Sequence, residues 1–91
     1  MGAKEVKRCR HKKAKWMASL KDHPCMDCSV QYPHYVMDWD HVHGDKEFEL
    51  GDARRDNTSR VRILAEIEKC ELVCSNCHRI RHRKLNGYAT V

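Results

Sequence analysis

Aromatic residues are few in this sequence, and long apolar runs are absent. Phe, Trp and Tyr make up 7% of the 91 residues, and the mean hydropathy is −0.82 although apolar residues reach 41%. No stretch approaches the roughly 18 consecutive apolar residues of a membrane span, so we expect a soluble protein with no membrane partner. A purely apolar core is marginal at this chain length. The sequence therefore predicts a small domain that needs a further source of stability, such as a metal site.

A secretory leader and a flexible linker are also missing. Residues 1–15 are basic and contain neither the apolar segment nor the small-residue cleavage site of a signal peptide. We therefore expect a reducing, cytoplasmic location, where zinc-bound thiolates are more plausible than disulfides. No Gly/Ser-rich segment divides the chain. This predicts a single domain over 1–91, with a basic N-terminal helix in 1–24, a core in 25–83 and a tail in 84–91.

Basic residues outnumber acidic ones. The chain has 18 Lys and Arg against 13 Asp and Glu, which gives a formal net charge of +5 and a pI of about 9.0. A positive surface attracts polyanions because binding releases the cations condensed around phosphates. We therefore expect a nucleic acid partner, although the sign of the charge does not distinguish DNA from RNA.

Three helices are expected, over residues 4–21, 58–69 and 76–82. The first combines good helix formers with many Lys and Arg, and His23-Pro24 ends it. Asn86-Gly87 is a plausible stop for the third. The candidate N-caps of the second are Asn57, Thr58 and Ser59.

Two strands are expected, over residues 35–41 and 70–73. The first is rich in aromatic and β-branched residues, which favour strands. Gly44, Asp45 and Gly51 mark a loop after it. Helices and strands together predict an α+β fold.

Two Cys-x-x-Cys pairs give the most specific metal signal. Cys25, Cys28, Cys74 and Cys77 can close a tetrahedral sulfur shell around zinc, because each short spacing lets one turn deliver two thiolates to the same ion. Two unrelated reduced pairs, or a redox pair, are the alternative, but no thioredoxin-like pattern surrounds either one. A mixed set that uses His78 would leave one cysteine idle. Cys9 and Cys70 remain as ordinary thiols, with Cys70 expected to be buried.

Asp40-His41 and the pair His78 and His82 form a second group of metal-binding residue types. Adjacent side chains of a strand point to opposite faces unless a bulge re-aims them. Residues four apart on a helix project from the same face, so His78 and His82 can share an ion. Asp40 with two imidazoles would leave positions for water and a phosphate oxygen. Taken singly, each residue has a plainer alternative as a solvent-facing or phosphate-contacting side chain.

These motifs resemble the HNH endonucleases of the ββα-metal (His-Me finger) type, the zinc-knuckle kind found in phage and bacterial genomes. The resemblance covers residues 24–83. It rests on Cys-x-x-Cys, Trp39-Asp-His41-Val, Lys46-x-Phe48 and the run from Ala65 through Cys74-Ser-Asn-Cys-His-Arg-Ile-Arg-His82. It implies a small ββα-metal fold with a structural zinc site and an additional N-terminal helix.

The resemblance also implies residue roles in hydrolysing a DNA phosphodiester. His41 would be the general base, and Asp40, His78 and His82 would hold a catalytic Mg²⁺, Mn²⁺, Ni²⁺ or Zn²⁺ beside the structural Zn²⁺. The middle asparagine of the motif is assigned to Asn57. Asn76 is its rival, and a helix N-cap is an alternative role for Asn57.

Several basic residues are expected to contact DNA phosphates, which position a duplex without reading its sequence. Asp38 is a candidate auxiliary ligand or a solvent-facing residue, and His43 competes with His41 as the base. The resemblance allows a phage terminase or packaging complex as a partner, and a monomer or weak homodimer. The expected DNA contacts are Arg60, Arg62, Arg79, Arg81, Arg83 and Lys84.

A non-catalytic zinc module that binds nucleic acid or a protein is the main alternative function. The retained Asp40, His41, His78 and His82 argue against it without excluding it. A zinc-dependent deaminase is disfavoured because the chain lacks the His-x-Glu that would supply its proton shuttle.

Overall fold

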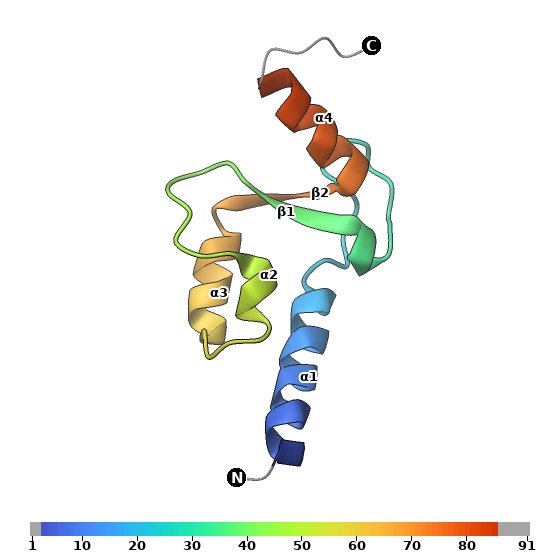
Figure 1. The fold of residues 1–91 in the computed structure, drawn as a ribbon. Coiled ribbons are helices and arrows are strands. Elements are labelled where there is room, and N and C mark those ends of the chain that lie inside the picture. The colour runs from blue at the N-terminus through green and yellow to red at the C-terminus, as the bar shows by residue number, and fades with distance from the viewer. Residues whose placement is uncertain (1–2, 86–91) are drawn as a thin grey trace.

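The computed structural model describes the backbone of residues 3–85 and the side chains of residues 11–84. A long N-terminal helix stands apart from the shorter elements, which gather around two strands (Figure 1). The elements are α1 (Ala3–Ser19), a 3₁₀ helix η1 (His34–Val36), β1 (Met37–His41), α2 (Leu50–Ala53), α3 (Arg60–Ile67), β2 (Cys70–Cys74) and α4 (Ser75–Leu85).

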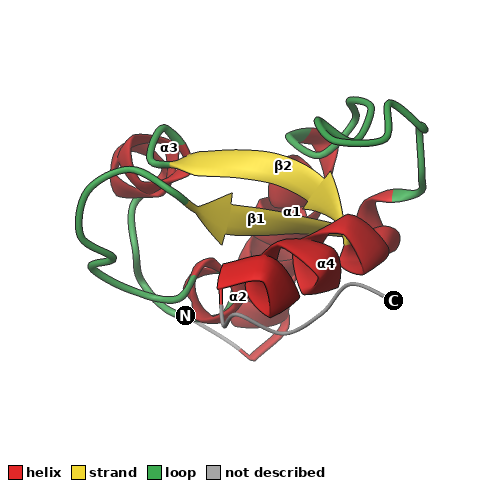
Figure 2. Ribbon diagram, turned by 90° about the horizontal axis from the view of Figure 1, so that it is seen from above, coloured by secondary structure: helices red, strands yellow, loops and turns green. Residues whose placement is uncertain are grey.

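The strands β1 and β2 form a two-stranded antiparallel sheet, with α4 lying across it (Figure 2). Side chains alternate across a strand, so Met37, Trp39 and His41 lie on one face and Asp38 and Asp40 on the other. The aspartates face α4. The register pairs Met37 with Cys74, Asp38 with Val73, Trp39 with Leu72, Asp40 with Glu71 and His41 with Cys70.

Two small apolar clusters lie on either side of Trp39, which packs against both. One contains Met37 and Val73 from the strands together with Cys25, and the other contains Leu50 and Ile63 from α2 and α3. Neither cluster is large, as the composition predicted. The molecule is thus a small α+β fold in which the sheet joins two modest cores.

Most of the expected elements are present, with shifted ends. The first helix stops at Ser19 because the next residues, Leu20 and Lys21, bond three residues back to Met17 and Ala18 and so tighten the last turn. The first strand begins only at Met37, since the three residues before it form η1.

The expected loop after β1 contains a short helix that the sequence did not reveal. Gly51 indicated a loop, but α2 forms there and buries Leu50 and Ala53 against Ile63. For the next helix, the N-cap is Ser59, whose side chain accepts a hydrogen bond from the Arg62 backbone N–H. Packing overrode the local preference for a loop.

Within the described residues, no helix is long and apolar enough to cross a membrane. The expected helix stop at Asn86-Gly87 lies outside the described residues, and so does the side chain of Cys9.

Candidate metal centres

The four cysteines of the two Cys-x-x-Cys pairs meet in one cluster. One ligand atom from each of Cys25, Cys28, Cys74 and Cys77 lies within 4.8 Å of the others. Four thiolates on a tetrahedral zinc at ~2.3 Å would stand ~3.8 Å apart, so the cluster has the size of a zinc site. Cys70 is a free thiol outside this group. The cluster fits zinc, and it ties the loop before β1 to the junction of β2 and α4.

Backbone N–H groups point at the sulfur atoms of this cluster. Cys25 Sγ accepts hydrogen bonds from the N–H groups of Cys28 (3.5 Å) and Cys74 (3.3 Å), and Cys74 Sγ accepts one from Cys77 (3.4 Å). Burial by itself would raise the pKa of Cys25, but these donors outweigh it and lower the pKa to about 6. Ser29, which follows the first pair, has a left-handed φ of 65° and accommodates the tight turn. The backbone N–H groups thus favour the thiolate form of Cys25, which is the form that binds a metal.

A second cluster brings together Asp40 from β1 with His78 and His82 from α4. The Nε2 atoms of the two histidines are 3.0 Å apart, and His78 Nε2 lies 3.4 Å from Asp40 Oδ1. Two nitrogens bound at ~2.1 Å and at a right angle to each other would also be ~3.0 Å apart. The imidazoles therefore face a common point, next to a carboxylate, as ligands of one divalent ion would.

Asp38 fixes how His78 presents its ring. Asp38 Oδ2 lies 3.1 Å from His78 Nδ1, on the side of the ring opposite the cluster. Because a carboxylate accepts the Nδ1 proton, the Nε2 lone pair remains free for a metal. Asp38 therefore supports a ligand instead of facing only solvent, and the alternation of the strand places it beside Asp40.

Arg81 binds the carboxylates that surround this cluster. Its guanidinium donates to Asp27 at 2.6 and 2.7 Å, to Asp40 Oδ2 at 3.0 Å and to Glu71 at 2.9 Å. Pairing with Asp27 raises the pKa of Arg81 still further above its ordinary value. Asp27 belongs to the first Cys-x-x-Cys turn, so Arg81 links the thiolate cluster to Asp40. Arg81 was expected to contact DNA, but its guanidinium instead forms these ion pairs within the protein.

His41 lies on the other face of β1 and contacts a buried glutamate. His41 Nε2 is 2.8 Å from Glu66 Oε2, and the Glu66 side chain is only 1% exposed. Burial by itself would raise the pKa of Glu66, but hydrogen bonds from Lys69 Nζ, the Glu47 N–H and His41 outweigh it and lower the pKa. An ionised carboxylate accepts the Nε2 proton of His41, which leaves Nδ1 with a free lone pair.

A bulge-like contact follows His41 directly, beyond the end of β1. The N–H groups of Val42 and His43 both donate to the Lys69 carbonyl oxygen at 2.9 Å, so two residues after β1 oppose the single residue before β2. His41 then lines an open cavity of about 570 Å³ together with His78 and His82. Adjacent side chains of β1 therefore point in different directions, Asp40 toward His78 and His82 and His41 into the cavity.

The remaining predicted residues lie away from these contacts. Asn57 is exposed between α2 and α3, and among the described residues the hydrogen-bond partner of the His41 ring is Glu66, not an asparagine. Asn76 is exposed in the first turn of α4. Arg60 lies over the Trp16 ring at 4.9 Å and Arg62 over Phe48 at 5.3 Å. The exposed basic residues of α4 are Arg79, Arg83 and Lys84.

The sequence reasoning missed Glu66 and the internal role of Arg81. A signal for Glu66 was present, because it lies between Ile63 and Ile67 on the buried face of α3 and Lys69 follows it by three residues. A charged residue on an apolar helix face needs a partner. A scan against protein-family models found no matching family, and searches of curated proteins and of solved structures found no match.

Proposed function

We propose that this protein is a metal-dependent HNH endonuclease that hydrolyses DNA phosphodiester bonds. The observation that carries the proposal is one cavity lined by His41 on one side and by the converging His78 and His82 on the other. The antiparallel pair of β1 and β2, followed by α4, supports the proposal, and the thiolate cluster lies at the β2–α4 junction. General base and metal ligands would then approach one phosphate from two elements.

The donor sets fit two different kinds of metal. Four thiolates suit a structural Zn²⁺, and an Asp with two imidazoles suits an open site for Mg²⁺, Mn²⁺, Ni²⁺ or Zn²⁺. When bound there, a divalent ion would polarise a phosphate oxygen and stabilise charge on the leaving 3′-oxygen. Arg81 keeps Asp40 in place from its second oxygen.

His41 would act on the attacking water. Its Nε2 side is held by Glu66, so Nδ1 is the atom available to take a proton from a water molecule in the cavity. The hydroxide formed in this way attacks the phosphorus, and Glu66 keeps the ring in the required tautomer. Histidine suits this role because its charge changes near neutral pH.

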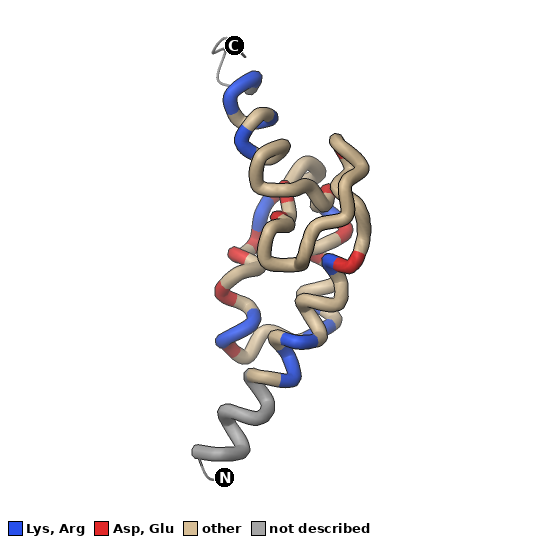
Figure 3. The backbone as a smooth tube through the Cα atoms, turned by 90° about the vertical axis from the view of Figure 1, so that its right-hand side faces the viewer, with Lys and Arg blue, Asp and Glu red and all other residues tan. Residues whose placement is uncertain are grey.

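DNA binding would rest on the exposed basic residues of α4 and α3. Lys and Arg follow one another along α4, whose first turns supply the metal ligands (Figure 3). Arg79 and Lys84 are exposed on α4, and Arg60 and Arg62 are exposed on α3. Such residues contact phosphates rather than base edges, so we expect weak sequence preference.

The test is cleavage of supercoiled plasmid by zinc-loaded protein with added Mg²⁺, Mn²⁺ or Ni²⁺, and with no added ion as the control. His41→Ala should lose at least ~100-fold in rate, the lower end of what a general base contributes, while DNA affinity stays unchanged. His43→Ala is the matched control, because this neighbouring histidine is exposed and should cut as well as the wild type.

Cleavage retained in His41→Ala would contradict the assignment of the base. No cleavage by a folded, DNA-binding wild type with any of the ions would contradict the nuclease proposal. That result would favour a non-catalytic zinc module that binds nucleic acid.

A further inference from the structure

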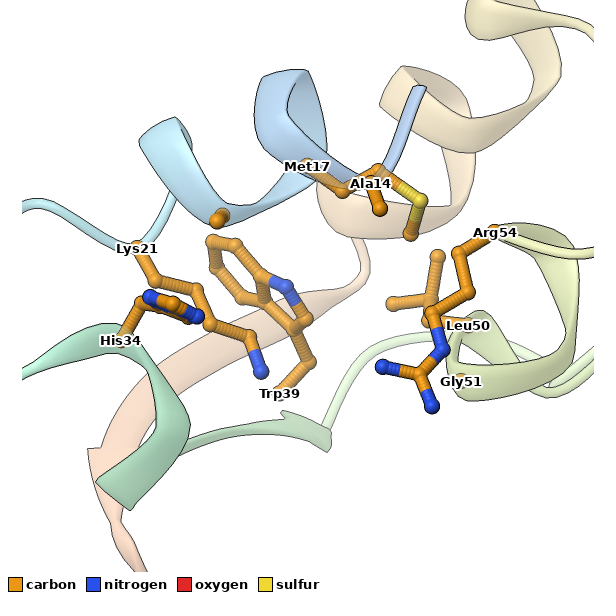
Figure 4. Close-up of a pocket in the computed structure, with 9 residues that line it drawn as sticks. Ala14, Met17, Lys21, His34, Trp39, Leu50, Gly51 and Arg54 are labelled. Atoms are coloured by element: carbon orange, nitrogen blue, oxygen red, sulfur yellow. The ribbon is translucent and has the colours of Figure 1, made fainter. Parts of the chain in front are cut away.

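A second cavity opens beside the one that contains His41. It has a volume of about 190 Å³ and lies between α1, β1 and α2 (Figure 4). Ala14, Met17 and Ala18 of α1 form its apolar wall, with Trp39 and Leu50 opposite. For scale, an apolar cavity of about 150 Å³ accepts a benzene ring. The space is thus wide enough for a single aromatic ring.

This cavity adjoins the proposed catalytic cavity. Four residues line both, namely Lys21, Trp39, Leu50 and Gly51. Nothing lies within 4 Å of where a Cβ of Gly51 would be, so no side chain fills the space beside this residue. A strand whose phosphate lies beside His41 could therefore place a neighbouring nucleotide here.

Two cationic side chains line this cavity together with Trp39. The amino group of Lys21 lies near the base of the Trp39 side chain, and the guanidinium of Arg54 lies beside Leu50 and Gly51 (Figure 4). Lys21 uses one of its three N–H donors on the Met37 carbonyl oxygen at 2.8 Å, which leaves two for a ligand. Arg54 is exposed, and no Asp or Glu lines this cavity. The two cations therefore favour an anion, and the apolar wall favours an apolar ring.

We infer that this cavity binds one unstacked nucleobase of the DNA strand that is to be cut, with Trp39 as the stacking surface and Lys21 and Arg54 on the adjoining phosphates. An aromatic ring with a phosphate on each side is the chemistry of a nucleotide in a single strand. A base in a duplex would first have to leave its stack. The inference deepens the proposed function and rests on it, and it predicts a preference for single-stranded, frayed or bulged DNA.

The test measures binding without cleavage, in Trp16→Phe protein that carries one zinc per chain, enough for the thiolate cluster alone, and with no other divalent ion. In that protein Trp39 is the sole tryptophan, so tryptophan fluorescence reports on the two adjoining cavities that Trp39 lines. The probes are a thymidine pentanucleotide and an abasic pentamer of the same charge. The thymidine pentanucleotide should quench the fluorescence of Trp39. It should also bind roughly 5- to 150-fold more tightly than the abasic pentamer, which is the affinity gain expected from stacking one base on an aromatic ring.

Ala14→Leu fills the cavity and should abolish both the quenching and the gain in affinity. Ser19→Leu is the matched control, since it adds similar bulk to an exposed position of the same helix and should change neither. Equal binding and quenching by the abasic pentamer would overturn the inference, and this comparison needs no variant that must fold.

Quenching that persists in folded Ala14→Leu would also overturn the inference. Because no cleavage is measured, a failure of the nuclease proposal shows only in the plasmid assay. A failure of the base subsite shows only in the fluorescence.

Discussion

Glu66 is the residue whose position says most about how His41 would work. A buried carboxylate is costly unless its partners are in place, and both Glu66 oxygens have them. Oε1 accepts from Lys69 Nζ at 3.0 Å, while Oε2 faces His41 and accepts from the Glu47 N–H at 3.2 Å. Apolar residues of similar volume often replace such a network without loss of stability, so stability alone does not require it. We therefore expect Glu66 to act on the ring of His41.

Glu66→Gln should reduce kcat on plasmid DNA by roughly 10- to 100-fold with little change in KM, less than the full ~10²–10⁴ of a general base. The amide keeps the shape of the side chain but no longer compels the Nε2–H tautomer. Nitrogen-15 NMR of His41 measures that tautomer directly. Glu68→Gln, an exposed change two residues along, is the control. An unchanged tautomer and rate in Glu66→Gln would show that Glu66 is only structural.

Lys69 gives this network a pH dependence. The Glu66 carboxylate raises the pKa of Lys69 above its ordinary value of 10.5. A raised pKa in the folded state means that the stabilisation is complete below pH 10.5 and is lost as pH rises through the folded value. Lys69→Met should therefore unfold more easily than the wild type at about pH 8, and the difference should shrink above about pH 11.

Urea denaturation at several pH values measures this difference in the free energy of unfolding. Lys12→Met, at an exposed position of α1, should show no such trend. A gap that stays constant up to about pH 11.5 would contradict the coupling of Lys69 to Glu66.

Among the secondary-structure elements, the junction of β2 and α4 is the one that a metal on the thiolate cluster would stabilise directly. Cys74 ends the strand, and Ser75 begins the helix with no residue between them. The thiolate cluster fixes this junction to the loop that carries Cys25 and Cys28, and the two apolar clusters are small. Without metal, the ion pairs of Arg81 with Asp40 and Glu71 and the contact of His78 with Asp38 would be left to hold α4 against the sheet.

Cys74→Ser should therefore abolish the cooperative thermal transition of the zinc-loaded protein, because structural zinc sites supply folding free energy directly. Cys70→Ser is the matched control, since Cys70 is a free thiol in the same strand outside the cluster. It should keep the transition and one bound zinc per chain, as measured by metal analysis. A normal melting curve for Cys74→Ser would rule out a structural role for the cluster.

The elements that carry metal ligands could be predicted because the ligands are close in sequence. Cys25 and Cys28 are three apart and share one turn, and His78 and His82 are four apart and share one helix face. The strand around Asp40 followed from its aromatic and branched neighbours. Local spacing therefore predicted each half of the two clusters, while the preference of zinc for four ligands indicated that the two cysteine pairs would meet.

The supporting residues could not be predicted, because their partners are distant in sequence. His41 and Glu66 are separated by 25 positions, and Arg81 and Asp27 by 54. No local sequence pattern predicts a contact between residues that are so far apart in the chain. The helix α2 was missed for a related reason, since the contact of Leu50 and Ala53 with Ile63, and not propensity, stabilises it around Gly51.

At the scale of the whole molecule, the proposed catalytic residues occur once in a chain of 91 residues. His41, His78 and His82 line one cavity, and Asp40 lies against the two α4 histidines, so the proposed site would engage one phosphodiester at a time. The two strands of a duplex run in opposite directions, so the second cut would need a second copy or a second binding event.

We therefore expect supercoiled plasmid to become open-circular first, with linear DNA appearing only after nicks accumulate on both strands. Gel analysis of a time course at several protein concentrations measures this. The rate of nicking should be proportional to protein concentration, and a site-directed nick placed beforehand should hasten linear product. Linear DNA that forms together with the first nicks, at a rate rising with the square of protein concentration, would instead mean that two chains act on one duplex. In that case the surface of α4 that carries Arg79 and Lys84 would have to contact DNA without blocking the binding of a second chain.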